Sequence, residues 1–296
     1  MVSADVIIIG GDAAGFFAAI NSAQLNKGCT VIILEKSSKL LSKVRISGGG
    51  RCNVTHACFD NGLLVKNYPR GEKELRNVFS RFTTSDTIQW FKNRGVQLKT
   101  EADGRMFPES NTSETIINCL LQEAQRSAIE IKLNVDIQEI RKNNDDTFIL
   151  KTRDIQQFQC KKLIVATGGN SKEEAYNWLK NLGHSIVKPV PSLFTFNIPD
   201  DPITQLMGIS VPLAKIKIKA AKLEMEGPLL ITHWGISGPA VLKTSAVAAR
   251  ILHDLDYCFT ISISWLPKYT KENVRIEFSK ERDEHAAKAV IRNCTF

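Results

Sequence analysis

The sequence predicts an α/β protein in which a parallel-sheet domain is joined to a smaller β-rich domain. Three observations predict this class. An apolar strand at residues 5–10 runs into a glycine turn and a helix, and a second apolar strand ends in two glycines at 163–169. After Pro189 the pattern changes to short alternating strands separated by proline and glycine.

The length and composition of the chain favour a globular protein of one large or two smaller domains. It has 296 residues, of which 43% are hydrophobic. Because no apolar run is long enough to span a bilayer and no basic leader precedes an apolar stretch, we expect a cytoplasmic protein without a membrane partner. The seven scattered cysteines are typical of reduced thiols rather than of a disulfide framework.

The net charge of +8 leaves two interpretations of the surface open. Basic residues are dispersed among acidic ones, as in "RGEKELRNVFSR", which favours an ordinary solvated surface. A moderate positive field also raises the affinity for a polyanion such as RNA without any base-specific contact. Composition does not decide between the two.

The first strand, helix and second strand predict a nucleotide site of the Rossmann type. We expect a strand at 5–10, a helix at 13–26 that ends near Gly28, and a strand at 30–35. Glu35 closes the second strand, where a carboxylate can accept the ribose hydroxyls of an adenosine. The glycine motif in register with these elements predicts a dinucleotide-binding turn.

Asp12 departs from the three-glycine motif of dinucleotide-binding turns. That motif has glycine at position 12 as well as at Gly10 and Gly15. An aspartate at a strand–helix junction is also a favoured N-cap, accepting the N–H groups that would hold a pyrophosphate. Asp12 would therefore compete for those donors and repel the phosphates, at a cost on the order of 1 kcal/mol or more. This predicts weaker binding at the turn.

The middle of the first domain is expected to alternate helices and strands. The periodicity predicts helices at about 72–94 and 112–127. The stretch "IEIKLNVDIQEIRKN" predicts a strand pair, or a strand and a turn, and the strand ending at 163–169 brings a second glycine turn beside the first.

The stretch "KVRISGGGRCNVTHAC" predicts a ligand-binding loop, with a flexible loop as the alternative. Three successive glycines allow close approach to a flat or charged ligand, Arg51 can bind phosphate, and Asn53 offers a bidentate amide. Cys52 could be a redox thiol or a buried hydrophobe. No fourth ligand stands at metal-like spacing near Cys52, His56 and Cys58, so no metal site is predicted.

We expect the β-rich domain to span residues 187–270, after a nucleotide-binding domain at 1–186 and before a charged helical segment at 271–296. Within it, "ITHWGISGPAV" places His233 in a glycine-rich turn before a helix. His233 could transfer a proton to a substrate or simply pack in the turn.

Together these motifs resemble the BaiN/RdsA (YhiN-like) family of NAD(P)/FAD-dependent flavoprotein oxidoreductases. The similar pieces run in family order along the whole chain: "VIIIGGDAAGFFAA", "ILEK", "KVRISGGGRCNVTHAC", "DGRMFPES", "LIVATGG", "LGHSIVKPVPSL" and "ITHWGISGPAVL". The resemblance implies a Rossmann-like FAD-binding domain of the two-dinucleotide-binding-domain type, with the β-rich domain inserted over the flavin. It also implies that the cofactor contacts are made by Gly10, Gly11, Asp12, Ala14, Gly15, Glu35, Lys36, Gly49, Gly50, Arg51, Cys52, Asn53, Val135, Thr167, Gly168 and Gly169.

The activity that this resemblance implies is hydride transfer through flavin N5, with NAD(P)H as the donor. The substrate is expected to be a small molecule or ribosomal RNA, with His233 and Cys52 as weak catalytic candidates. Family members continue beyond the equivalent of Phe296 with a segment that returns to the nucleotide domain. Two alternatives therefore stay open, a shortened non-catalytic remnant that binds FAD weakly or not at all, and a module that binds RNA through its basic surface.

Overall fold

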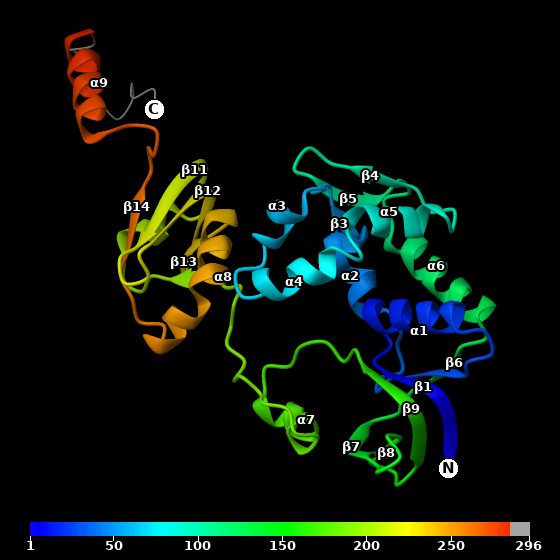
Figure 1. The fold of residues 1–296 in the computed structure, drawn as a ribbon. Helices are drawn as coiled ribbons and strands as arrows, with labels where there is room; N and C mark the ends of the chain where they lie inside the picture. Colours follow the sequence, from blue (N-terminus) through cyan, green and yellow to red (C-terminus); the bar gives the residue numbers. More distant parts are fainter. Residues whose placement is uncertain (285–296) are drawn as a thin grey trace. The chain divides into compact units, whose positions relative to one another are not determined.

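The computed structural model describes residues 1–284, which form two compact units (Figure 1). The first unit is Met1–Pro189 and the second begins at Val190. Each unit has its own sheet and its own hydrophobic core.

The first unit is built on a six-stranded sheet with the order β6-β2-β1-β9-β8-β7. Four of its strands are parallel: β6 (Glu130–Lys132), β2 (Val31–Leu34), β1 (Val2–Ile9) and β9 (Gln157–Val165). Successive side chains of β1 enter opposite cores, with Val6 and Ile8 on one face and Ile7 and Ile9 on the other. This two-sided burial explains the continuous apolar run in the sequence and confirms the predicted α/β class.

Strands β7 (Ile137–Lys142) and β8 (Phe148–Thr152) complete the sheet as an antiparallel pair beside β9. The expectation of a strand pair within 129–143 is therefore wrong, because β6 and β7 lie at opposite ends of the strand order. β6 pairs in parallel with β2, whereas β7 pairs with the strand that follows it. Short apolar segments do not reveal which partner they will meet.

Helices α1 (Ala13–Leu25) and α6 (Ser113–Arg126) cover one face of this sheet and confirm the helices predicted at 13–26 and 112–127. The helical stretch predicted at 72–94 is present but divided into two helices. The structure has α4 (Glu72–Phe79) and α5 (Thr84–Lys92), and the chain breaks between them. Thr83 begins α5 with a capping box, in which its side chain and that of Asp86 each bind the other's backbone N–H.

Between β2 and α4 the chain forms α2 (Ser42–Gly50), which is interrupted by non-helical backbone at residues 47–49, and then α3 (Asn61–Val65). A small antiparallel sheet of β3 (Thr55–His56), β5 (Arg105–Pro108) and β4 (Leu98–Thr100) lies beyond that break. After β9 come a short 3₁₀ turn at Glu173–Tyr176 and α7 (Asn177–Asn181).

The second unit contains a five-stranded antiparallel sheet with the order β10-β13-β12-β11-β14. Its strands are β10 (Phe196–Asn197), β11 (Ser210–Ile218), β12 (Leu223–Thr232), β13 (Gly235–Ser237) and β14 (Ile261–Ser264). Helix α8 (Pro239–Asp254) packs its small buried residues against this sheet, and a 3₁₀ turn spans Pro202–Leu206.

Helix α9 (Lys271–Glu284) ends the described chain, and the rest of the predicted segment 271–296 lies outside the described residues. Within residues 1–284, no helix is both long enough and apolar enough to cross a membrane.

Candidate nucleotide-binding site

Three loops of the first unit follow the carboxyl ends of neighbouring parallel strands. Residues 10–15 follow β1, Glu35 follows β2, and Thr167, Gly168 and Gly169 follow β9. β1 lies between β2 and β9, and the chain leaves β1 through α1 toward β2, so the order of the parallel strands changes direction between β1 and β9. A crevice at such a switch point is where open α/β sheets bind their ligands.

The first glycine turn is closed by backbone packing. A Cβ on Gly10 would lie 2.4 Å from the Ala166 oxygen, and one on Gly11 would lie 2.7 Å from Leu40 Cδ2. On Gly15 the Cβ would lie 1.8 Å from the Gly10 oxygen, because α1 passes directly over the turn. Gly10 and Gly15 therefore exclude a larger residue even without a ligand, because the added Cβ would meet backbone atoms, whereas at Gly11 it would meet the end of the Leu40 side chain.

Asp12 fits this turn without backbone strain, since its φ of −110° is open to any residue. It caps α1, with Oδ1 accepting from the Ala13 N–H at 3.0 Å. Oδ2 accepts from the backbone N–H of Lys43 at 3.2 Å. Asp12 thus joins the starts of α1 and α2, and its carboxylate lies at the end of α1 where a pyrophosphate would approach.

Glu35 is anchored to the same turn. Its Oε2 accepts from the Gly11 N–H at 2.7 Å and its Oε1 from the Ser37 N–H at 2.8 Å. Its backbone oxygen accepts from the Val135 N–H at 2.9 Å, which ties the loop after β6 to the end of β2. The carboxylate is therefore held in a fixed position beside the glycines.

Two cavities meet at these loops, and Gly10, Glu35, Thr167 and Gly168 line both of them. The first, of about 780 Å³, has a polar mouth and an apolar interior lined by side chains such as Phe17, Phe91, Ile116 and Leu120. The second, of about 650 Å³, lies on the side of the predicted adenosine contacts and is lined by residues that include Lys36, Val135, Asp136, Arg153 and Tyr176. Both volumes are in the range of small-molecule sites.

The glycine-rich loop at 48–50 has left-handed backbone at all three glycines, with φ of +57°, +68° and +84°. A Cβ on Gly48 would lie 2.8 Å from Phe107, whereas Gly49 and Gly50 face open space. The predicted phosphate ligand Arg51 instead pairs with Glu101 at 2.5 Å and stacks on Phe107, with Cζ 4.0 Å from the ring centroid. Its role in phosphate binding stays a prediction.

Cys52 and Asn53 follow Arg51, and both line the first cavity. Cys52 is buried with a left-handed φ of +62°, and burial raises the pKa of its thiol. A protonated, buried thiol is a poor nucleophile, which favours the hydrophobic interpretation of Cys52. The surrounding carbonyl groups fix the orientation of the Asn53 side-chain amide. In that orientation its nitrogen donates to the backbone oxygens of Thr55 at 2.9 Å and Met106 at 3.2 Å.

The remaining predicted site residues are placed as follows. Lys36 pairs with Asp136 at 3.2 Å and is mostly exposed. His233 lies in the second unit, exposed, with its ring edge-on to Trp234 at 4.3 Å between centroids, so its catalytic role stays a prediction. Among residues 1–284, no group of three or more His, Cys, Asp or Glu side chains is placed to hold a metal.

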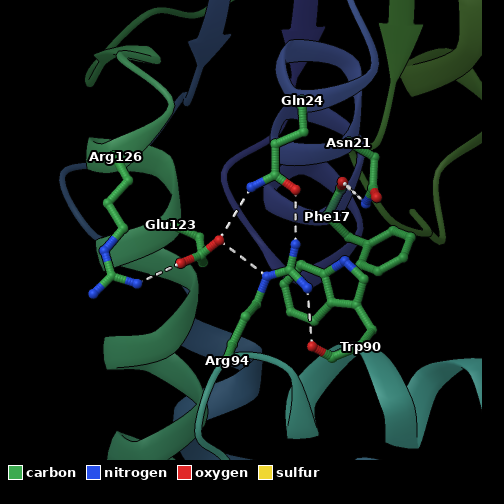
Figure 2. Close-up of polar contacts among 7 residues, drawn as sticks. All are labelled: Phe17, Asn21, Gln24, Trp90, Arg94, Glu123 and Arg126. Atoms are coloured by element: carbon green, nitrogen blue, oxygen red, sulfur yellow. Dashed lines mark hydrogen bonds and ion pairs between the residues drawn. The ribbon is translucent and has the colours of Figure 1, made fainter.

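A polar network centred on the buried Glu123 of α6, which sequence reasoning missed, joins α6 to α1 and to the end of α5 and supports the helix that follows the first turn (Figure 2). Glu123, 7% exposed, accepts from Gln24 at 3.1 Å, Arg94 at 3.0 Å and Arg126 at 2.8 Å. Arg94 also donates to the Trp90 oxygen at 2.9 Å and stacks on that indole. Burial alone would raise the pKa of Glu123, but these partners outweigh it and hold the pKa below its usual value.

The site and sheet define an α/β protein with a Rossmann-type crevice. Residues 4–280 match the model of the HI0933-like protein Rossmann domain, and the chain belongs to this family. The predicted resemblance to BaiN/RdsA proteins is thereby confirmed.

Two curated relatives and one solved structure agree with this assignment. The chain is 26% identical over 285 residues to the 3-dehydro-bile acid delta(4,6)-reductase of Clostridium scindens, covering 94% of this chain and 68% of that protein. It is 32% identical over 250 residues to the ribosomal RNA dihydrouridine synthase of Haemophilus influenzae, covering 81% of this chain and 60% of that protein. The chain therefore spans about two thirds or less of the length of these relatives.

A flavocytochrome c3 fumarate reductase in its open conformation shares the fold. The two structures superpose with a TM-score of 0.50 at 16% identity, covering 75% of this chain and 48% of that one. This likeness supports the predicted arrangement of a Rossmann-like domain with an additional antiparallel sheet.

Proposed function

We propose that this chain is the FAD-binding part of an oxidoreductase. One observation carries the proposal: two glycine turns, at 10–15 and 167–169, lie at adjacent strand ends with Glu35 beside them. Residues of both turns and Glu35 line both cavities. An extended dinucleotide needs this arrangement, with an adenosine on one side of the turns and a second group on the other. Family membership supports the same cofactor.

The residues present fit the two ends of FAD. Each Glu35 carboxylate oxygen already accepts one backbone N–H, from Gly11 or Ser37, and its remaining lone pair could accept a ribose hydroxyl. The backbone around Val135 would contact the adenine. The pyrophosphate would lie over the start of α1, where the Ala14 N–H has no intrahelical partner. The Asp12 carboxylate is the feature that opposes this fit, and we expect it to weaken binding without preventing it.

When bound, FAD supplies hydride transfer, and the chain's own residues orient it and exclude water. We propose NAD(P)H as the electron donor. The flavin would enter the first cavity, whose lining includes Ser47, Cys52, Asn53 and Thr167. The apolar interior beyond them excludes water from that side.

The absorption spectrum of the purified chain, with a titration of added FAD, tests the cofactor. The unmodified chain should bind FAD and show a flavin spectrum, and Asp12→Gly should bind it more tightly because a like charge is removed from the phosphates. Glu35→Gln, which keeps the size of the side chain, should bind FAD more weakly. If neither the chain nor Asp12→Gly binds FAD, the proposal fails and the non-catalytic interpretation holds.

For the substrate we propose an unsaturated small molecule or uridine in ribosomal RNA. The two relatives named above are a bile acid reductase and a ribosomal RNA dihydrouridine synthase. The net charge of +8 supports the RNA alternative. RNA binding that weakens steeply with salt would favour the RNA substrate. NADPH oxidation stimulated by an unsaturated acid, with no RNA binding, would favour the small molecule.

A further inference from the structure

Lys43 lies at the point where the two glycine turns face each other. Its Nζ lies 2.6 Å from the position that a Cβ on Gly168 would take, so the ammonium rests against the second turn. Its backbone N–H donates to Asp12 in the first turn. Both Lys43 and Asp12 line the mouth of the first cavity.

Asp12 removes backbone donors from this mouth. Its two oxygens accept from the first N–H of α1, at Ala13, and from the Lys43 N–H near the start of α2. A pyrophosphate at a Rossmann turn is normally held by such N–H groups and by the positive end of the helix. With these two donors engaged and a carboxylate added, a side-chain cation would restore the positive charge that the turn loses.

Two lysines of the cavity lining could supply that cation. The charged residues that line the first cavity are Asp12, Glu35, Lys39 and Lys43. Within the described part of the chain neither lysine forms an ion pair, whereas Arg51 is bound to Glu101 and Lys36 to Asp136. Of the two lysines, Lys43 has its ammonium placed against Gly168 of the second turn, while its backbone N–H is bound to Asp12 of the first.

We propose that Lys43 binds the pyrophosphate of the dinucleotide and offsets the charge of Asp12. This inference rests on the proposed FAD site and adds to it the residue that makes the departure at position 12 compatible with binding. An ammonium hydrogen-bonded to a phosphate oxygen forms a charge-assisted pair, stronger than the neutral N–H contact that it replaces. The interaction should be specific for the phosphates and independent of the adenine.

The test compares FAD dissociation constants of the full chain and three variants, measured by quenching of flavin fluorescence at low and high salt. Lys43→Met should weaken FAD binding about ten-fold. It should also reduce the salt dependence, because one phosphate contact is lost. Lys43→Arg, which keeps the charge, should stay within about three-fold of the unmodified chain. Lys39→Met is the matched control and should have the smaller effect.

A second comparison tests the link with Asp12. Asp12→Asn keeps an N-cap side chain and removes the charge. In that background Lys43→Met should cost less affinity than it does in the unmodified chain, because less charge is left to offset.

The outcomes separate the two proposals. If the unmodified chain binds FAD and Lys43→Met binds it equally well with the same salt dependence, the role of Lys43 is overturned and the FAD site stands. If Lys39→Met has the larger effect, the cation is Lys39 and the assignment is wrong. If Asp12→Gly binds FAD and the unmodified chain does not, Lys43 fails to offset the charge of Asp12, so its role is overturned and the FAD site stands. If neither binds FAD, both proposals fall.

Discussion

The two glycine-rich segments of the first unit, at 10–15 and at 48–50, need glycine for different reasons. In the first, an added Cβ would collide with the backbone at Gly10 and Gly15. In the second, Gly49 and Gly50 have open space around them and need glycine only for their left-handed backbone. One segment is a packed junction of strand and helix, and the other is an open loop.

The difference extends to what supports each segment. The first turn leads into α1, which the Glu123 network joins to α5 and α6 (Figure 2). The open loop is held mainly at its ends, by Gly48 against Phe107 and by Arg51 on Glu101. We therefore expect substitutions at Gly10 and Gly15 to lower the stability of the fold strongly, and those at Gly49 and Gly50 to lower it less.

The largest effect is expected for Gly15→Ala. Its Cβ would lie 1.8 Å from the Gly10 oxygen, so α1 would have to move away from β1. The free energy of unfolding should fall by about 3 kcal/mol, measured by urea denaturation. Ala14→Ser, at the exposed neighbouring position, is the control and should change it by less than about 0.5 kcal/mol. Equal effects of the two would show that the turn is not tightly packed.

Glu123→Gln should lower the free energy of unfolding by about 2 kcal/mol, because Arg94 and Arg126 lose a charged acceptor. Thermal unfolding of the variant and of the unmodified chain measures this loss of stability. The control is Glu139→Gln, which removes a more exposed carboxylate paired with Arg141 and Lys151, and should cost less than about 1 kcal/mol. A larger loss at Glu139 would contradict a supporting role for the buried network.

Glu123 also predicts a dependence on pH. The pKa of Glu123 is lower in the folded than in the unfolded state. Its contribution to the free energy of unfolding is therefore fully present above about pH 4.3 and is lost as the pH falls through the folded-state pKa. Stability measured from pH 6 down to pH 3 should therefore fall less steeply in Glu123→Gln than in the unmodified chain. Parallel curves would show that the carboxylate is not stabilised by its partners.

Gly49→Ala should cost about 1 kcal/mol, since alanine at φ +68° is strained but meets no neighbour. Gly48→Ala, at φ +57°, should cost more, because its Cβ would also lie 2.8 Å from Phe107 and 2.9 Å from the Asn53 nitrogen. The comparison is made by urea denaturation. A Gly49 variant less stable than the Gly48 variant would mean that the loop is not open at Gly49.

The smallest effect is expected for Asp12→Gly in the absence of ligand, a loss of a few tenths of a kcal/mol, because glycine is a tolerable N-cap. Thermal unfolding of the ligand-free chain checks this. A loss above about 1 kcal/mol would indicate that the bond from Asp12 to the Lys43 N–H holds α2 in place as well.

Much of the site could be predicted from the sequence because it follows local rules. The strand, glycine turn, helix and terminal Glu35 lie within a short stretch, and their spacing alone places them at one end of a sheet. The end of α4 was missed although a signal exists, since Thr83 followed by Asp86 is a capping box.

Other parts depended on partners far away in the sequence. Arg51 was expected to face phosphate, and its guanidinium lies on Glu101, fifty residues further along. Glu123 and Gln24 are ninety-nine residues apart, and no periodicity indicates their contact. Lys43 stands in a motif noted for its glycines, and only the position of Gly168 shows where its ammonium lies.

The sequence by itself determined the family, the α/β class, the first glycine turn and the capping role open to Asp12, because these depend on side-chain period, on glycine's freedom and on hydrogen bonds between near neighbours. The tertiary structure alone decided which strands pair, which carboxylates meet which cations, and where Lys43 and the two cavities lie. Those features depend on contacts between residues distant in the chain, and such contacts form only once the sheet and its helices have packed.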